Sequence, residues 1–152
     1  MQLFRICLSK WTSTLKASGQ PARWNSKGKY VVYTSENRSL ACLENLVHRS
    51  GFGKNELFKI LVIDVPNNIK INEVVANQLP KNWMEFSNYP ICQKIGNKWI
   101  DSLGSCILKV PSSIIPQEYN YLINPLHKEF KLIKTSSTED FNFDRRLNQS
   151  PI

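Results

Sequence analysis

Short hydrophobic blocks alternate with polar stretches along this chain, and most of the blocks have the composition and length of β-strands. Runs rich in β-branched and aromatic residues predict strands, and they cover residues 3–7, 29–34, 57–65, 106–116, 127–137 and 141–147. Pro111 is expected to bend or end the strand in which it stands, because proline cannot donate to a sheet. Residues 69–75 are interpreted as a further strand or as the passage from a strand to a helix.

Two segments have the pattern of helices. Residues 35–51 begin with a possible N-cap, Ser35, and reach a glycine stop at Gly51, while Glu36 suits the first turn. Residues 90–105 carry apolar side chains at positions 91, 95, 99 and 103, a four-residue spacing that predicts one helical face.

The order of these elements favours one fold class. Strands outnumber helices and do not alternate regularly with them, which predicts an α+β fold with a mixed or antiparallel sheet and a few helices. Residues 9–29 are polar, contain glycine and proline, and are expected to form a long loop. With 152 residues, of which 41% are hydrophobic, we expect residues 1–152 to form a single domain with its own core.

Charge narrows the kinds of partner. The chain has a formal net charge of +8, and the first third holds most of it, with a net charge of +6 over residues 1–50 and no acid before Glu36. Such an excess favours an anionic partner, which could be a nucleic acid, a membrane surface or a small molecule that carries phosphate. No apolar run approaches the roughly 18–20 residues that a membrane-spanning helix needs.

The four cysteines stand at positions 7, 42, 92 and 106, and no pair has the spacing of a redox motif or zinc site. We therefore expect buried free thiols, a cytoplasmic location and no bound metal. The apolar run from Leu3 to Leu8 is too short for a secretory signal. The basic, acid-poor opening is also typical of a transit peptide, but the pattern of residues 3–7 favours a first strand.

Glu44 is the first candidate for chemistry. At about 100° per residue, Leu40, Leu43 and Val47 share one stripe of the predicted helix, and Glu44 lies about 40° from Leu40. A carboxylate at that edge either extends into solvent or stands at a pocket wall, where burial changes its pKa.

Arg23 and Tyr33 are the next candidates. Arg23 lies beside Trp24 in a loop, so it is either a surface charge or an anchor for phosphate oxygens. Tyr30 and Tyr33 are three residues apart and face opposite sides of their strand, so one of them can line a given pocket. We favour Tyr33, which lies near the strand end with Ser35.

Residues 110–127 contain two turns bounded by prolines, and they hold Ser112, Ser113, Asn120 and Asn124. This segment is either a plain structured loop or a polar wall that faces a ligand. His127 is interpreted as a structural loop residue. Glycine-rich dinucleotide and phosphate motifs and the GxSxG motif are absent from the sequence.

Together these segments resemble the RES domain family, named for an arginine, a glutamate and a serine. The resemblance is carried by residues 22–48, by residues 96–130 and by the FNFDRRL motif near the end of the chain. Ala22 departs from the family, which usually has glycine there, and residues 66–95 match little. The match assigns the name-giving residues to Arg23, Glu44 and Ser112, and further patterned positions to Arg5, Tyr33 and Asn124.

The resemblance implies a fold similar to ADP-ribosyltransferases and NAD⁺ as the substrate. It implies that the protein is the toxin of a bacterial toxin–antitoxin pair, in complex with a helix-turn-helix (Xre-like) antitoxin through which any contact with DNA is made. On this basis we hypothesise that Arg23, together with Arg5, binds the diphosphate and that Tyr33 stacks against nicotinamide. Glu44 would hydrogen-bond the ribose and stabilise its developing positive charge, and Ser112 would hold the ribose or a phosphate. Ser35 and Asn124 are further substrate-binding candidates.

Three functions remain open. The protein depletes NAD⁺ by hydrolysis or phosphorolysis, or it transfers ADP-ribose to a protein, and labelled NAD⁺ distinguishes the two. A small nucleic-acid-binding module is the third, and it would bind DNA or RNA with a steep dependence on salt. Aromatic stacking motifs of the known RNA-binding type are absent, which disfavours this third reading.

Overall fold

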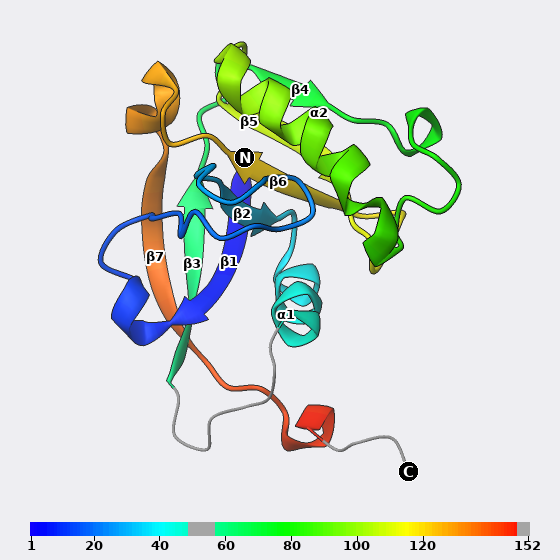
Figure 1. The fold of residues 1–152 in the computed structure, drawn as a ribbon. Helices are drawn as coiled ribbons and strands as arrows, with labels where there is room; N and C mark the ends of the chain where they lie inside the picture. The colour runs from blue at the N-terminus through cyan, green and yellow to red at the C-terminus, as the bar shows by residue number, and fades with distance from the viewer. Residues whose placement is uncertain (49–56, 149–152) are drawn as a thin grey trace.

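A seven-stranded sheet forms the centre of the computed structural model, which describes residues 1–48 and 57–148. The strand order is β4-β5-β6-β2-β1-β3-β7 (Figure 1), and β4 runs parallel to β5 while the other neighbours are antiparallel. The expected α+β fold with a mixed sheet is therefore confirmed. The elements are β1 Gln2–Leu8, β2 Val32–Ser35, α1 Arg38–Val47, β3 Phe58–Asp64, β4 Ile71–Glu73, α2 Tyr89–Ser102, β5 Ile107–Pro111, β6 Tyr119–Ile123 and β7 Lys134–Phe141.

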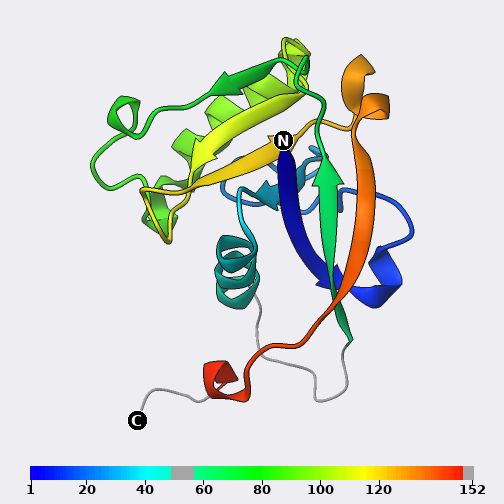
Figure 2. The same ribbon diagram turned by 180° about the vertical axis from the view of Figure 1, so that it is seen from behind.

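The sheet is strongly twisted, and each of its halves carries one helix. Strands β1, β3 and β7 run side by side, while β5 and β6 cross them obliquely and α2 lies along these two strands (Figures 1 and 2). Helix α1 packs beside β1 and β2. Among the described residues, no helix combines the length and the apolar character required to cross a membrane.

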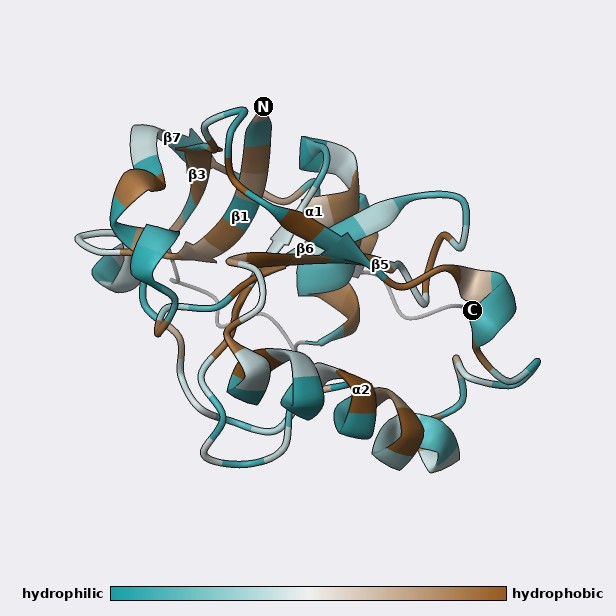
Figure 3. Ribbon diagram, turned by 90° about the horizontal axis from the view of Figure 1, so that it is seen from above, coloured by the Kyte–Doolittle hydropathy of each residue, from teal (hydrophilic) through white to brown (hydrophobic). Residues whose placement is uncertain are grey.

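The core lies on both faces of the sheet because strand side chains alternate between faces. Along β5, Leu108 and Val110 pack with the tryptophan-rich cluster beneath α2, whereas Ile107 packs on the opposite face with Leu3 and Ile123. Seen from above, β1 and β3 are largely hydrophobic, whereas α2 alternates between hydrophobic and hydrophilic residues (Figure 3). A third cluster connects α1 to β1 and β3, and it contains Phe4, Ile6, Ala41, Phe58, Ile60 and Val62.

Most predicted strands are present, with shifted ends. The predictions for residues 3–7 and 57–65 are confirmed by β1 and β3. The run at 29–34 becomes a strand only from Val32, and the run at 106–116 ends as a strand at Pro111, as expected. Residues 69–75 contain the short strand β4.

The helix predictions were correct in place but not in detail. Asn37, not Ser35, caps α1, because its side chain accepts a hydrogen bond from Leu40 N at 2.8 Å while Ser35 is the last residue of β2. Glu36 precedes α1 rather than lying in its first turn, and the expected stop at Gly51 lies outside the described residues.

The predicted apolar face of α2 was also displaced. A four-residue spacing advances about 40° per step, so the stripe drifts around the helix. As a result Ile91 and Leu103 are 39% and 49% exposed, whereas Trp99 is buried. The buried face consists of Cys92, Gly96, Trp99 and Ile100.

Three segments near the end of the chain differ from the predicted strands and loops. Residues 110–127 include a central strand, β6, which their asparagines and prolines concealed. Residues 141–147 are not a strand, since β7 ends at Phe141 and Arg145–Asn148 form a 3₁₀ helix. In 127–137, a 3₁₀ helix at Lys128–Leu132 precedes the start of β7.

The register of the three middle strands positions the candidate site. Ser35, at the end of β2, is paired with Phe4 of β1 on one side and with Asn120 of β6 on the other. Helix α1 starts immediately afterwards, so its inner face lies beside these strand ends. Residues from positions 4, 35, 44 and 120 therefore meet in one place.

Candidate active site

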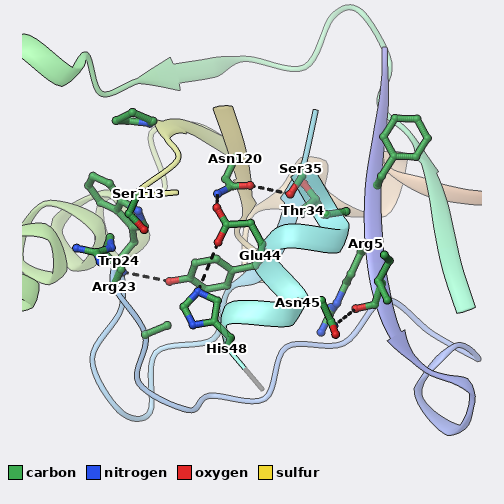
Figure 4. A pocket seen from close by; sticks show the side chains of 16 residues that line it. Arg5, Arg23, Trp24, Thr34, Ser35, Glu44, Asn45, His48, Ser113 and Asn120 are labelled. Carbon is green, nitrogen blue, oxygen red and sulfur yellow. Dashed lines mark hydrogen bonds and ion pairs between the residues drawn. The ribbon is translucent and has the colours of Figure 1, made fainter. Parts of the chain in front are cut away.

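A pocket of about 270 Å³ opens where the ends of β1, β2 and β6 meet α1 and the loop before β2 (Figure 4). Of the predicted site residues, it brings together Arg5, Arg23, Tyr33, Ser35 and Glu44. The other side chains in its wall are Phe4, Ile6, Ala22, Trp24, Thr34, Ala41, Asn45, His48, Pro111, Ser113 and Asn120.

Glu44 stands on the inner face of α1 because it lies, in helical projection, between the buried residues Leu40 and Ala41. Its carboxylate is 18% exposed and lines the pocket, so it is not the solvent-directed edge residue of the alternative reading. Oε1 accepts hydrogen bonds from Ser112 Oγ, at 2.8 Å, and from Asn120 Nδ2. Oε2 lies 3.4 Å from His48 Nε2, one helical turn further along.

These contacts determine the ionisation of Glu44. Burial by itself would raise the pKa of the carboxyl, but hydrogen bonds from His48, Asn120 and Ser112 outweigh burial and hold that pKa below its usual value of 4.5. Glu44 is therefore a negatively charged carboxylate at neutral pH, held in one orientation inside a partly enclosed pocket.

Asn120 is held in turn by Ser35. The Ser35 hydroxyl donates to Asn120 Oδ1 at 2.7 Å, so the amide nitrogen of Asn120 faces Glu44. Ser35 is only 3% exposed, and its side chain is occupied by this contact. The two residues are direct neighbours in the β2–β6 pairing. Ser35 therefore supports the carboxylate through Asn120.

Ser112 is fully buried at 0% exposure and is not part of the pocket wall. It follows Pro111, and its hydroxyl oxygen accepts hydrogen bonds from the backbone of Ile114 at 3.0 Å and Ile115 at 3.1 Å while donating to Glu44. The expected direct contact of Ser112 with ribose or phosphate is not supported by this placement. Its side chain instead joins the turn after β5 to the Glu44 carboxylate.

Arg23 forms part of the pocket wall opposite α1. Its Nη1 donates to the Trp83 carbonyl and its Nη2 to the Met84 carbonyl, each at 2.7 Å. The guanidinium also lies over the ring of Tyr89, 4.4 Å from the centroid. Ala22, where the family usually has glycine, does not have a positive φ, so alanine adds no backbone strain to this loop.

Tyr33 lines the pocket with a ring that is fixed at its far end. Its hydroxyl donates to Asn25 Oδ1 at 2.7 Å and accepts from Trp24 N at 3.2 Å. Burial raises the pKa of this phenol, so it remains neutral. Tyr30 is 49% exposed and does not line the pocket, in agreement with the choice of Tyr33.

Arg5 adds a second guanidinium to the pocket wall. Burial lowers the pKa of Arg5, but an arginine stays protonated at neutral pH. Its Nη1 donates to the Lys16 carbonyl at 2.7 Å. In the part of the chain that the structure describes, neither Arg5 nor Arg23 has a carboxylate partner. Guanidinium groups that line a pocket without a carboxylate partner favour an anionic ligand.

Asn124 is the one predicted site residue that the structure places in neither the pocket wall nor its supporting contacts. It is 0% exposed, donates to the Ile100 carbonyl at 3.0 Å and accepts from Leu126 N at 3.0 Å. These contacts close the turn after β6. His127 is also structural, because its Nδ1 accepts from Glu129 N at 3.2 Å at the start of a 3₁₀ helix.

His48 and Asn120 are functional candidates that the sequence analysis did not identify as site residues. The sequence spacing could have identified His48, because a residue four positions after Glu44 faces the same side of the helix. Asn120 was part of the proposed polar wall, but its contact with Glu44 depends on a strand pairing that the sequence pattern did not predict. Among residues 1–48 and 57–148, no group of three or more His, Cys, Asp or Glu side chains could hold a metal.

Comparisons with known proteins identify the family of this chain. The RES domain model matches residues 2–144. Toxin Res of Photorhabdus laumondii is 37% identical over 97% of this chain and 97% of its own length. The Prs ADP-ribosylating toxin of Sphingobium sp. is 35% identical over 82% of this chain and 79% of its own length.

A solved structure shares the fold. A chain in the crystal structure of the M. tuberculosis MbcT–MbcA toxin–antitoxin complex superposes with a TM-score of 0.71, over 92% of this chain and 83% of that one. The sequence identity of the pair is only 12%, so this likeness concerns the fold alone. By the match over residues 2–144 and by its curated relatives, the chain belongs to the RES domain family.

Proposed function

We propose that this protein is the toxin of a toxin–antitoxin pair and that it cleaves NAD⁺ at the bond between nicotinamide and ribose. The observation that carries the proposal is the ionised Glu44 carboxylate, held in a pocket wall by Ser112, Asn120 and His48. A fixed negative charge in a partly enclosed pocket stabilises a positive charge that develops beside it.

The chemical step would use Glu44 in this way. The bond between the ribose carbon and the nicotinamide nitrogen breaks, and its electron pair leaves with nicotinamide. The ribose ring then carries an oxocarbenium-like positive charge, which the neighbouring carboxylate stabilises. Addition of water gives ADP-ribose and a proton, and addition of inorganic phosphate gives a phosphorylated ADP-ribose.

Other pocket residues fit the remaining parts of NAD⁺. The guanidinium groups of Arg23 and Arg5 would bind the diphosphate. Both arginines contact only neutral backbone carbonyls through the hydrogen bonds described above, so the diphosphate would supply an anionic partner. The fixed ring of Tyr33 would stack against nicotinamide. Ser35 and Ser112 would act through the orientation of Asn120 and Glu44 rather than on the ligand.

Transfer of ADP-ribose to a protein is the second candidate reaction. It is favoured by the 35% identical relative that is named as an ADP-ribosylating toxin. Both reactions share the first bond cleavage and differ in the acceptor that attacks the ribose. A nucleic-acid-binding module is the third candidate, with no observation in its favour beyond the positive charge.

The partner we propose is a cognate antitoxin with a helix-turn-helix fold of the Xre type, acting in the cytoplasm. A toxin–antitoxin complex among the structures of similar fold supports an antitoxin partner. Contact with DNA would then be made through the antitoxin. Co-expression with a small neighbouring reading frame, followed by co-purification, tests this part of the proposal.

One experiment separates the reactions. The purified chain is incubated with NAD⁺ labelled in its adenosine part, with and without inorganic phosphate, and with and without a bacterial protein extract. Free labelled ADP-ribose or its phosphate, formed without extract, supports depletion. Label found only on a protein band supports transfer, and unchanged NAD⁺ in every mixture contradicts both.

A further inference from the structure

The guanidinium of Arg23 is held from two sides by the segment that precedes and begins α2. The Trp83 and Met84 carbonyls accept its Nη1 and Nη2 hydrogen bonds, each at 2.7 Å. The Tyr89 ring lies 4.4 Å from the guanidinium carbon and the Trp83 ring 5.5 Å from it. We call the Trp83 and Met84 carbonyls and the Tyr89 ring the Arg23 clamp.

The clamp is itself firmly attached to the protein. Trp83 is 4% exposed and packs against Trp24, the neighbour of Arg23, with ring centroids 6.1 Å apart. Tyr89 is the first residue of α2, and α2 approaches the Trp24 backbone so closely that a Cβ on Gly96 would lie 1.8 Å from the Trp24 carbonyl oxygen. The clamp and the loop that it holds therefore form one packed unit.

The clamp leaves Arg23 with unused binding capacity. Neutral carbonyls and a ring occupy part of the guanidinium without cancelling its charge, and no carboxylate among the described residues does so. A guanidinium has more N–H groups than the two carbonyls use, in a rigid fork that matches phosphate oxygens. Holding such a fork in place before the ligand binds lowers the entropy cost of binding.

We propose that Tyr89 is a positioning residue for phosphate recognition, and that the Arg23 clamp orients the free N–H groups of Arg23 toward a diphosphate in the pocket. This inference deepens the proposed NAD⁺ function, on which it rests for the identity of the ligand. The Tyr89 hydroxyl has no hydrogen-bond partner among the described residues, so the ring is the part that acts.

The test compares a ligand that carries the diphosphate with one that lacks it. Calorimetric titration measures the affinity for ADP and for adenosine with the wild type, Tyr89→Phe, Tyr89→Leu and Arg23→Lys. Trp11→Leu is the matched control, because Trp11 also contacts a cation, Lys10, yet does not line the pocket. Thermal unfolding of each variant shows that it is folded.

We expect Tyr89→Leu to bind ADP about fivefold more weakly than the wild type, from the loss of one cation–π contact, with adenosine binding unchanged. Tyr89→Phe and Trp11→Leu should bind both ligands as the wild type does. Arg23→Lys keeps the charge but not the fork, and it should lose at least as much ADP affinity as Tyr89→Leu, which tests the inference even if Tyr89→Leu does not fold.

The inference is overturned if Tyr89→Leu or, should that variant not fold, Arg23→Lys binds ADP with wild-type affinity. It is also overturned if the variants lose affinity for ADP and for adenosine by the same factor, or if the wild type binds ADP no more tightly than adenosine. None of these measurements requires turnover. A protein that reads the diphosphate through Arg23 but leaves NAD⁺ intact would contradict the proposed function and still support the clamp.

Discussion

Ser112 and Glu44 are 68 positions apart in the sequence, and the Ser112 hydroxyl donates a hydrogen bond to Glu44 Oε1 at 2.8 Å. Because Ser112 is completely buried, its contribution to the site passes through this contact. The glutamate is thus the group that faces the pocket, and the serine, together with His48 and Asn120, keeps it ionised and oriented.

Replacing Ser112 by alanine removes a donor that lowers the pKa of Glu44. A carboxyl whose pKa is lower in the folded than in the unfolded protein stabilises the fold above its unfolded pKa, near 4.5, and loses this effect as the pH falls through the folded value. In Ser112→Ala we expect the acid limb of NAD⁺ cleavage to move to higher pH. A pH–rate profile from about pH 3 to about pH 8 measures the shift of this acid limb.

The same variant leaves the backbone N–H groups of Ile114 and Ile115 without their acceptor. The free energy of unfolding should therefore fall by about 1–3 kcal/mol. Ser39→Ala, at an exposed position of α1, is the control and should change neither property. An acid limb that stays in place in Ser112→Ala would show that the serine does not tune Glu44.

Asn120→Asp places a second carboxylate against Oε1 of Glu44. Two carboxylates in contact cannot both ionise without a large cost, so one of the two pKa values rises. We expect NAD⁺ cleavage at neutral pH to fall at least tenfold, by about 1.4 kcal/mol or more in the activation free energy. The stability deficit relative to wild type should shrink at pH 5, as measured by denaturant unfolding.

Ser35→Ala is the companion to that variant. It leaves Asn120 in place but removes the donor that orients the amide, so a smaller loss of activity is expected. Equal losses in Ser35→Ala and Asn120→Asp would mean that charge repulsion is not the cause.

These residues show which parts of the site local sequence patterns can predict. Glu44 was found because helical periodicity brings it close to Leu40, and α1 depends on local signals. The support of that carboxylate was not predictable in the same way. Asn120 reaches it only because β6 pairs with β2, and β6 is hidden among residues that favour turns, Asn120 and Asn124 among them.

The sequence also did not show which groups contact each site residue or whether its side chain is buried. Arg23 was identified as a phosphate anchor, but nothing in its own loop indicates that Trp83, Met84 and Tyr89 hold it. Ser112 was expected at the ligand because the sequence does not report burial. Local patterns predicted the sheet class and most strands, whereas contacts between distant segments decided which polar groups face the pocket.

Gly96→Ala tests how closely α2 supports the loop that carries Arg23. A Cβ at this position would lie 1.8 Å from the Trp24 carbonyl oxygen, so the loop or the helix must move. We expect the free energy of unfolding to fall by about 1–3 kcal/mol, and NAD⁺ cleavage to fall with it. Circular dichroism during thermal unfolding and the cleavage assay measure the two effects.

The control for that variant is Gly104→Ala. There the nearest atom would be Ser102 Oγ at 3.4 Å, an ordinary contact, and the backbone does not have a positive φ. It should unfold and react as the wild type does. Wild-type stability in Gly96→Ala would contradict the close packing of α2 on the Trp24 loop.

Asn124→Ala distinguishes a structural asparagine from a ligand-binding one. The change leaves the Ile100 carbonyl and Leu126 N without their side-chain partner, so the unfolding free energy should drop by about 1–3 kcal/mol. The KM for NAD⁺ should stay at its wild-type value below the unfolding temperature, in steady-state assays. A raised KM in a folded Asn124→Ala protein would instead support a direct contact between Asn124 and the substrate.

The central claim is that the Glu44 carboxylate drives cleavage of NAD⁺, and release of nicotinamide by Glu44→Gln tests it most directly. Glutamine keeps the shape of the side chain and removes its charge, while Glu73→Gln changes an exposed glutamate on β4 as the control. We predict nicotinamide release by the wild type and by Glu73→Gln, and at least a hundredfold slower release, about 2.7 kcal/mol, by Glu44→Gln. Release by folded Glu44→Gln at the wild-type rate would contradict the claim.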